Sequence, residues 1–255
     1  MLTELKQNNI MKSFLTAFTM VLFSCTGSTQ LSKPPADDRV LKDVYKDAFL
    51  IGTAVNPGTT SGRDKTTQEI VIKHFNSITV ENVMKAALIN PEPGVYNFGQ
   101  ADDYVAFGEK NKMFIIGHTL VWHNQCPAWF FTNAAGKPNT KEEQIERLRS
   151  HIEAVAGRYA GRVHAWDVVN EVISDKEDEY FRPSLWYQIC GEEFVAKAFQ
   201  WAHEADPKAL LFYNDYNEID PVKRQKIIKL VNDLKAKGIP INGIGLQGHW
   251  AENEP

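Results

Sequence analysis

The chain has 255 residues, of which 43% are hydrophobic, and this is enough for one large or two medium domains. Its formal net charge at pH 7 is −4, and basic and acidic residues are interspersed along the sequence. We therefore expect no nucleic-acid partner, because a nucleic-acid-binding surface needs a face rich in Lys and Arg.

The first residues of the chain have the composition of an export signal. Lys12 precedes an apolar run from Phe14 to Phe23, which is too short to span a bilayer as a stable helix. The end of this run and the residues after it resemble a bacterial lipoprotein signal, in which Cys25 is lipidated and becomes the mature N-terminus. Met11 is an alternative start, and a buried N-terminal helix is the alternative interpretation.

These features predict a signal peptide at 1–25, a flexible tether at 26–40 and a folded domain at 41–255. The protein is then exported, either as a cell-envelope lipoprotein of the outer membrane, periplasm or cell surface, or as a secreted protein. We expect a monomer that contacts a membrane only through lipidated Cys25. Cys126 and Cys190 lack CxxC spacing, so a thiol or zinc role is not expected, and whether they pair is left open.

From about Ala48 onward, short apolar runs alternate with longer amphipathic segments, a pattern typical of βα units around a parallel sheet. Strands are predicted at 49–55, 77–80, 114–118, 163–167, 210–213 and 241–246, and helices at 65–75, 101–110, 141–159, 192–205 and 221–237. Pro221 suits the first turn of the last helix, and Gly238 suits its C-terminal cap.

Two layouts fit this pattern: a doubly wound sheet, or most of an eight-fold barrel. A doubly wound nucleotide-binding fold needs a glycine-rich turn after its first strand, and 55–62 contains neither GxGxxG nor GxxxxGK[ST]. Functional residues at every strand end are instead typical of a barrel whose site lies at its carboxyl face. We predict an α/β fold, a TIM (β/α)8 barrel that is incomplete here, with about six of eight βα units.

Polar and aromatic residues come directly after the predicted strands, at the carboxyl end of each strand. They are Glu81, Asn82 and Lys85; His118, Trp122 and Gln125; Asn170 and Glu171; Asn214 and Tyr216; Gln247 and His249. Taken singly, each has an ordinary explanation, such as a core histidine or a solvated lysine. Their repetition indicates a site for a ligand rich in hydroxyl groups, since amides and charged groups both donate and accept hydrogen bonds. No phosphate cradle or HExxH motif is present, and no metal or organic cofactor is implied.

The stretch 164–171 is predicted to be a short buried strand that delivers Asn170 and Glu171 into a cleft. Strict alternation along a strand would send these neighbours to opposite faces. Both reach the cleft only if the backbone bulges or turns, so we predict irregular backbone there. Asp167, earlier on the same strand, is expected to face away from the cleft.

Several of these motifs resemble, in order, the signatures of glycoside hydrolase family 10, the endo-β-1,4-xylanases. They are GHTLVWH at 117–123, WDVVNE at 166–171, NDYN at 214–217, GLQGH at 245–249 and ENVMK at 81–85. In the last of these regions, Val83 and Ala86 differ from the usual residues of the family. The resemblance extends over about 49–250 and implies an eight-fold βα barrel that hydrolyses xylan with retention of configuration.

The resemblance also implies a role for individual residues. Glu171 matches the general acid/base, and Asn170 matches the residue that binds the sugar 2-hydroxyl. Gln247 and His249 match residues that orient the nucleophile and bind sugar. The remaining matches are substrate-binding residues: Glu81, Asn82 and Lys85 on the glycone side, His118, Trp122 and Gln125 beside them, and Tyr216 on the aglycone side.

The second catalytic carboxylate of the family has no counterpart in this sequence. A retaining glycosidase needs a nucleophile about 5–5.5 Å from the acid/base, and the family supplies it from a Thr-Glu-x-Asp motif on strand seven. The one Thr-Glu pair here is Thr3-Glu4, in the leader. We therefore predict a C-terminally truncated endo-1,4-β-xylanase (EC 3.2.1.8 type) that is nearly inactive alone, with two open sheet edges. The alternatives are a non-catalytic xylan-binding remnant and a related barrel hydrolase of cellulose or mixed-linkage glucan.

Overall fold

The computed structural model describes residues 38–249, so the predicted signal peptide, lipidated Cys25 and nearly all of the tether lie outside the described residues. Its sheet consists of β1 (Gly52–Val55), β2 (Ser77–Val80), β3 (Phe114–Trp122), β4 (Ala165–Asn170), β5 (Leu210–Asp215) and β6 (Gly243–Leu246). The six strands lie in sequence order, and every pairing is parallel. A doubly wound sheet would reverse its strand order at one point. The incomplete barrel is therefore confirmed.

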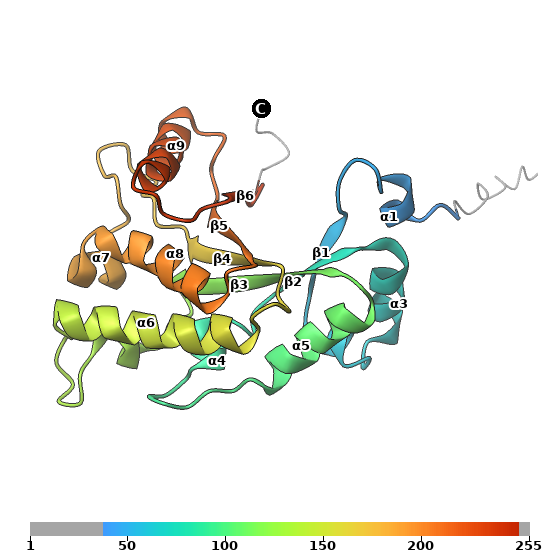
Figure 1. Ribbon diagram of the computed structural model, residues 1–255, viewed down its shortest axis with the longest axis horizontal. Helices are drawn as coiled ribbons and strands as arrows, with labels where there is room; N and C mark the ends of the chain where they lie inside the picture. Colours follow the sequence, from blue (N-terminus) through green and yellow to red (C-terminus); the bar gives the residue numbers. More distant parts are fainter. Residues whose placement is uncertain (1–37, 250–255) are drawn as a thin grey trace, which may run out of the picture. The chain divides into compact units, whose positions relative to one another are not determined.

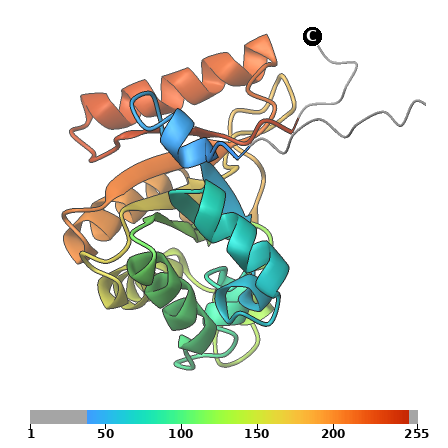
Figure 2. The ribbon, with the colours of Figure 1, turned by 90° about the vertical axis from the view of Figure 1, so that its right-hand side faces the viewer.

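The helices lie around the outside of the curved sheet (Figures 1 and 2). The long ones are α3 (Lys65–His74), α5 (Gly99–Lys110), α6 (Lys141–Arg158), α8 (Glu193–Ala205) and α9 (Pro221–Ala236). Each agrees with a predicted helix to within a residue or two. The short ones, α1 (Leu41–Val44), α2 (Pro57–Thr60), α4 (Ala86–Ile89), η1 (Ala128–Phe131) and α7 (Leu185–Cys190), were not predicted. Elements of one turn are too short to show a periodic pattern.

Local sequence explains where two of the long helices begin. Thr140 and Glu143 form a capping box at the start of α6, each side chain accepting a backbone N–H of the other. At α9, Asp220 caps the N–H of Lys223 at 2.7 Å and Pro221 occupies the first turn, as predicted. The capped first turn of α9 fixes the direction in which the Lys223 side chain leaves the helix.

The helices and the outer face of the sheet enclose the core. Trp166, Ile115 and Leu211 are all fully buried there. Gly117 is required where β3 passes Trp166 of β4, because a Cβ at this position would lie 2.2 Å from the indole ring. Within the described residues, β1 and β6 each pair with one neighbour, so both edges of the sheet are open, as predicted. None of the described helices is long and apolar enough to cross a membrane.

Two irregularities interrupt the otherwise even ladder around β4. The register between β3 and β4 shifts between His118 and Val121, and the register between β4 and β5 shifts between Asp167 and Val169. The peptide bond between His118 and Thr119 is cis. Such bulges change the direction in which nearby side chains point. Both bulges lie beside the cavity that is described below.

Candidate active site

A cavity of about 760 Å³ opens at the carboxyl ends of the strands. Its wall contains most of the residues predicted from the sequence: Glu81, Lys85, His118, Trp122, Asn170, Glu171, Asn214, Tyr216, Gln247 and His249. Asn82 and Gln125 lie beside it, since the Asn82 amide oxygen accepts hydrogen bonds from Lys85 Nζ at 3.0 Å and from Gln125 Nε2 at 3.3 Å. The fold therefore gathers the predicted residues into one site.

Glu171 has the most constrained side chain in this cavity. It is 8% exposed, and both carboxylate oxygens accept hydrogen bonds. Trp122 Nε1 donates to Oε2 at 2.7 Å, and Gln247 Nε2 donates to Oε1 at 2.9 Å. The carboxylate is therefore held between β3 and the end of β6, with its position fixed from two sides.

The backbone at Glu171 is irregular, as predicted. Its φ is +58°, in the left-handed region that a residue with a Cβ enters at a cost of about 1–3 kcal/mol. Its N–H donates to the carbonyl of Asn214 at 2.8 Å, so β4 and β5 stay paired through the turn. This conformation lets Asn170 and Glu171 share one cavity, which strict strand alternation would forbid.

Asn170 is oriented by two neighbouring amides. Asn214 Nδ2 donates to its Oδ1 at 2.8 Å, and Gln247 Nε2 lies 3.2 Å from the same oxygen. Gln247 was predicted, together with His249, to orient the nucleophile and bind sugar; among the described residues its side chain contacts Asn170 and Glu171. Asn214 was noted only as a strand-end residue, and its contact with Asn170 depends on a register that the sequence alone does not specify.

The expectation that Asp167 faces away from the cavity is wrong. Asp167 lines the cavity, and its Oδ2 lies 2.8 Å from His118 Nδ1. Counted back from Asn170, strict alternation puts Asp167 on the opposite face, and the register shift beside Asp167 breaks that count. His118 is therefore a partnered cavity residue and not a core histidine.

Lys85 and Trp122 form a basic and aromatic part of the cavity wall. Lys85 Nζ lies 4.9 Å from the centroid of the Trp122 ring. Burial lowers the pKa of Lys85, and the nearby Glu171 and Glu81 oppose that shift. Lysine, indole and amide groups at this spacing suit a sugar, whose hydroxyls both donate and accept hydrogen bonds while its ring face is apolar.

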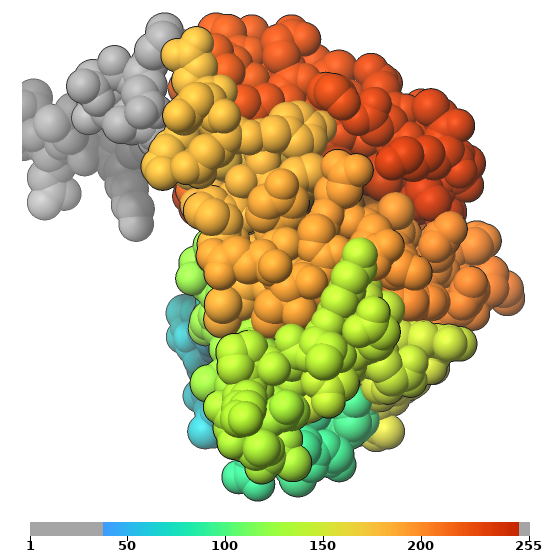
Figure 3. All heavy atoms as spheres, turned by 90° about the vertical axis from the view of Figure 1, so that its left-hand side faces the viewer, coloured from blue at the N-terminus to red at the C-terminus, as the bar shows by residue number. Residues whose placement is uncertain are grey.

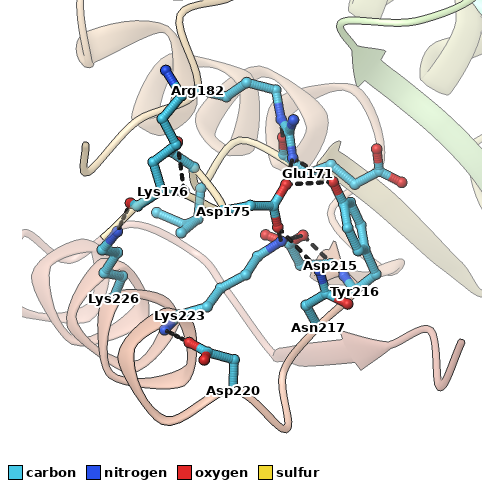
Figure 4. A network of polar contacts seen from close by, with 12 residues as sticks. Glu171, Asp175, Lys176, Arg182, Asp215, Tyr216, Asn217, Asp220, Lys223 and Lys226 are labelled. Atoms are coloured by element: carbon cyan, nitrogen blue, oxygen red, sulfur yellow. Dashed lines mark hydrogen bonds and ion pairs between the residues drawn. The ribbon is translucent and has the colours of Figure 1, made fainter. Parts of the chain in front are cut away.

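An ionic network on the other side of Glu171 was not anticipated from the sequence (Figure 4). Asp175 Oδ2 accepts from Arg182 Nη2 at 2.9 Å and from the Tyr216 hydroxyl at 2.6 Å. Asp175 Oδ1 lies 2.7 Å from Lys223 Nζ, which also pairs with Asp215 at 2.9 Å. Lys223 is 2% exposed, so a lysine that reads as a solvated helix residue is buried within the network.

The two carboxylates of this network have pKa shifts of opposite sign. Burial dominates at Asp215 and raises its pKa, although Tyr213 and Lys223 oppose the shift. Burial also acts on Asp175, but hydrogen bonds from Lys223, Tyr216 and Arg182 together outweigh it and hold the pKa well below its usual range. Asp175 is therefore the firmly ionised member of the network.

The fold and the site together define a parallel βα barrel, incomplete here, with a cavity at its carboxyl face. A family model described as glycosyl hydrolase family 10 matches residues 40–255. The chain belongs to this family.

Similar proteins agree with that assignment. A beta-1,4-xylanase of Dictyoglomus thermophilum is 54% identical over 210 residues, which are 82% of this chain and 57% of the relative. Endo-1,4-beta-xylanase B of Paenibacillus barcinonensis is 48% identical, over 83% of this chain and 62% of the relative. The crystal structure of xylanase XynB from Paenibacillus barcinonensis, complexed with a conduramine derivative, has a TM-score of 0.81 at 47% identity and covers 85% of this chain and 64% of that one. The chain thus spans about three-fifths of the length of these relatives.

Proposed function

We propose that this chain is the greater part of an endo-1,4-β-xylanase, with xylan and xylo-oligosaccharides as substrates and Glu171 as the general acid/base. The observation that carries the proposal is the placement of Glu171, buried and held by Trp122 and Gln247, beside Asn170 in a cavity of about 760 Å³. The names of similar proteins support xylan as the polymer.

In the proposed reaction, Glu171 protonates the glycosidic oxygen as the leaving sugar departs, while a second carboxylate attacks the anomeric carbon. Glu171 then takes a proton from the water that hydrolyses the covalent glycosyl-enzyme. Asn170 donates, in this proposal, to the 2-hydroxyl of the sugar under attack, and its hydrogen bond from Asn214 supports a fixed orientation of its amide. Lys85, Asn82 and Gln125 form the proposed glycone side of the cavity, and Tyr216 the aglycone side.

We further propose that the nucleophile belongs to sequence outside these 255 residues, so that the chain alone binds but does not hydrolyse xylan. The sequence contains no Thr-Glu-x-Asp motif. Of the other carboxylates in the cavity wall, Asp167 is paired with His118, and Glu81 is exposed beside Lys85. Because Asp167 has a partner and Glu81 a proposed sugar-binding role, we assign neither as the nucleophile.

The test uses calorimetric titration of the 255-residue chain with xylotriose and cellotriose, followed by a hydrolysis assay on xylan. Binding of xylotriose with no hydrolysis supports both proposals, and tighter binding of cellotriose would favour a glucanase.

The DNA reading frame after Pro255 separates the truncated enzyme from a xylan-binding remnant. A Thr-Glu-x-Asp motif soon downstream supports the enzyme, and a genuine stop codon supports the remnant.

In the extended chain, Glu171→Ala should slow xylan hydrolysis far more than hydrolysis of aryl xylosides with acidic phenols. Equal losses on both would contradict the acid/base assignment.

Export as a lipoprotein is a separate proposal, supported by the sequence at Leu22–Cys25. Metabolic labelling with an alkyne fatty acid should tag the wild-type protein but not Cys25→Ser. Equal labelling of both would reject lipidation at this residue.

A further inference from the structure

The loop between β4 and α7, residues 171–184, is fastened to α9 by side chains from both. Lys226 Nζ donates to the carbonyl of Glu179 at 2.7 Å, and the Tyr180 hydroxyl donates to the carbonyl of Lys226 at 3.2 Å. Lys223 adds its ion pair with Asp175. Figure 3 shows this loop, in amber, packed beside α9, in red-orange. The segment that follows Glu171 is therefore restrained by a helix from the next βα unit.

Arg182 connects this fastened loop to Glu171 itself. Its Nε donates to the backbone carbonyl of Glu171 at 3.1 Å. Its Nη2 donates to Asp175 at 2.9 Å and to the Tyr216 hydroxyl at 2.8 Å (Figure 4). The guanidinium is planar and offers donors in a rigid fork, so fixing Nη2 on two partners also fixes the direction of Nε.

The carbonyl that Arg182 binds belongs to the residue with the strained backbone. A left-handed glutamate persists only where its surroundings over-determine it. Its N–H is held by Asn214 and its carbonyl by Arg182, so both peptide groups that flank the φ and ψ of Glu171 are restrained. Rotation about either bond would carry the carboxylate away from Trp122 and Gln247.

Charge balance argues that the network acts through geometry. The cations Arg182 and Lys223 are matched by the anions Asp175 and Asp215, so the network adds no net charge beside Glu171. Arg182 also contacts the backbone carbonyl of Glu171 and not its carboxylate, so its direct contact acts on the backbone.

We propose that Arg182 is a positioning residue for Glu171, which holds the left-handed backbone of Glu171, and hence its carboxylate, in the cavity. Asp175, Tyr216 and Lys223 hold Arg182 in turn. The inference rests on the proposed function only in taking Glu171 as the acid/base; the restraint itself is a property of the folded chain.

The experiment reads the position of Glu171 directly, in the full 255-residue chain without substrate. The indole N–H resonance of Trp122, assigned by its loss in Trp122→Phe, reports the hydrogen bond to Glu171. Hydrogen exchange of the Glu171 amide reports its bond to Asn214. In Arg182→Met, the indole resonance should move upfield and the amide should exchange about tenfold faster, as expected when a hydrogen bond to a charged group is lost.

Two further variants separate geometry from charge and from general stability. Arg182→Lys keeps the charge beside Asp175 but cannot bind Asp175, Tyr216 and the Glu171 carbonyl together, so it should behave like Arg182→Met. The matched control is Arg162→Met, which removes the exposed bidentate pair with Glu109 at the other end of β4 and should leave both signals unchanged.

If Arg182→Met fails to fold, Asp175→Asn is the substitute, with smaller changes of the same sign. Unchanged indole and amide signals in a folded Arg182 or Asp175 variant, or full restoration of both signals by Arg182→Lys, would overturn the proposal.

Xylotriose titration of the wild-type chain tests the proposed function separately. Absent binding would count against xylan as the ligand and would leave the indole and amide results standing.

Discussion

The two ends of β4 are held by ion pairs of different kinds. Just before the strand, Arg162 makes a bidentate pair with Glu109, and both side chains are more than two-fifths exposed. Just after it, Glu171 leaves the strand with positive φ beside Lys223 and Asp215, which are almost fully buried. The exposed pair lies at a turn in which a glycine, Gly161, takes the left-handed conformation, whereas the buried network surrounds a left-handed glutamate. The difference indicates that the buried ion pairs after β4 lie where a side chain must be held against its local backbone preference.

The largest effect is expected from breaking the buried network. Lys223→Met leaves Asp215 and Asp175 without their shared cation, and removing one partner of a buried ion pair costs about 3–5 kcal/mol. Urea unfolding of the variant should give a free energy of unfolding that is lower by this amount. The control is Val222→Met, on the exposed side of the same helix. A loss no greater than that of the control would mean that Lys223 is not buried in solution.

The next effect concerns a buried histidine behind β3. His151 is 2% exposed, and burial lowers its pKa to about 4. Since its unfolded pKa is about 6.5, the unfolded chain takes up the proton first as pH falls. The stability associated with neutral His151 is therefore complete above pH about 6.5 and is lost progressively toward pH 4, by about 3 kcal/mol in total. His151→Leu should flatten this part of the stability curve; an acid dependence identical to wild type would contradict the assignment.

A smaller effect is expected where β3 and β4 cross. Gly117→Ala places a methyl group against the Trp166 ring, where only a shift of strand or indole can accommodate it, at a cost of about 1–3 kcal/mol. Gly157→Ala in α6 is the matched control, because a Cβ there meets open space and should stabilise by about 0.5–1 kcal/mol. Opposite signs in thermal unfolding confirm the close approach of the two strands, and equal signs would contradict it.

The smallest effect is expected at the exposed end of β4. Arg162→Met removes the pair with Glu109, and exposed ion pairs contribute about 0–1 kcal/mol. The loss should shrink further in 1 M salt, where surface charges are screened. Urea unfolding at low and high salt checks this expectation. A loss of unfolding free energy as large as that of Lys223→Met would contradict the difference proposed between the exposed pair before β4 and the buried network after it.

Much of the fold and the site could be predicted because both depend on local signals. Apolar runs located the strands, and Pro221 located the start of α9. The carboxyl ends of parallel strands gather at one face of a barrel. Residues as distant in sequence as Glu81 and His249 could therefore be assigned to one cavity from the sequence alone.

The errors and omissions depend on long-range geometry. Asp167 was assigned to the wrong side because a bulge is invisible in the alternation of side chains. Lys223 was overlooked although it lies at helical spacing before Ile227, Leu230 and Leu234, on the buried face of α9. That spacing indicates burial, but the partner that permits it, Asp175, lies 48 residues earlier in the loop after β4.

The separation in sequence of the residues that hold Glu171 has a consequence for the order in which the chain folds. The hydrogen bond from Gln247 to the Glu171 carboxylate spans 76 residues, whereas the contact of His118 with Asp167 between β3 and β4 spans 49. Such non-local contacts form only after the loops between them have closed, so the Glu171 carboxylate should become fixed late, after β4 has paired with β3. Pulse-labelled hydrogen exchange during refolding would then protect the amides of β4 before that of Gln247, whose N–H donates to Asp215. Glu171 would be among the last parts of the domain to acquire a defined position.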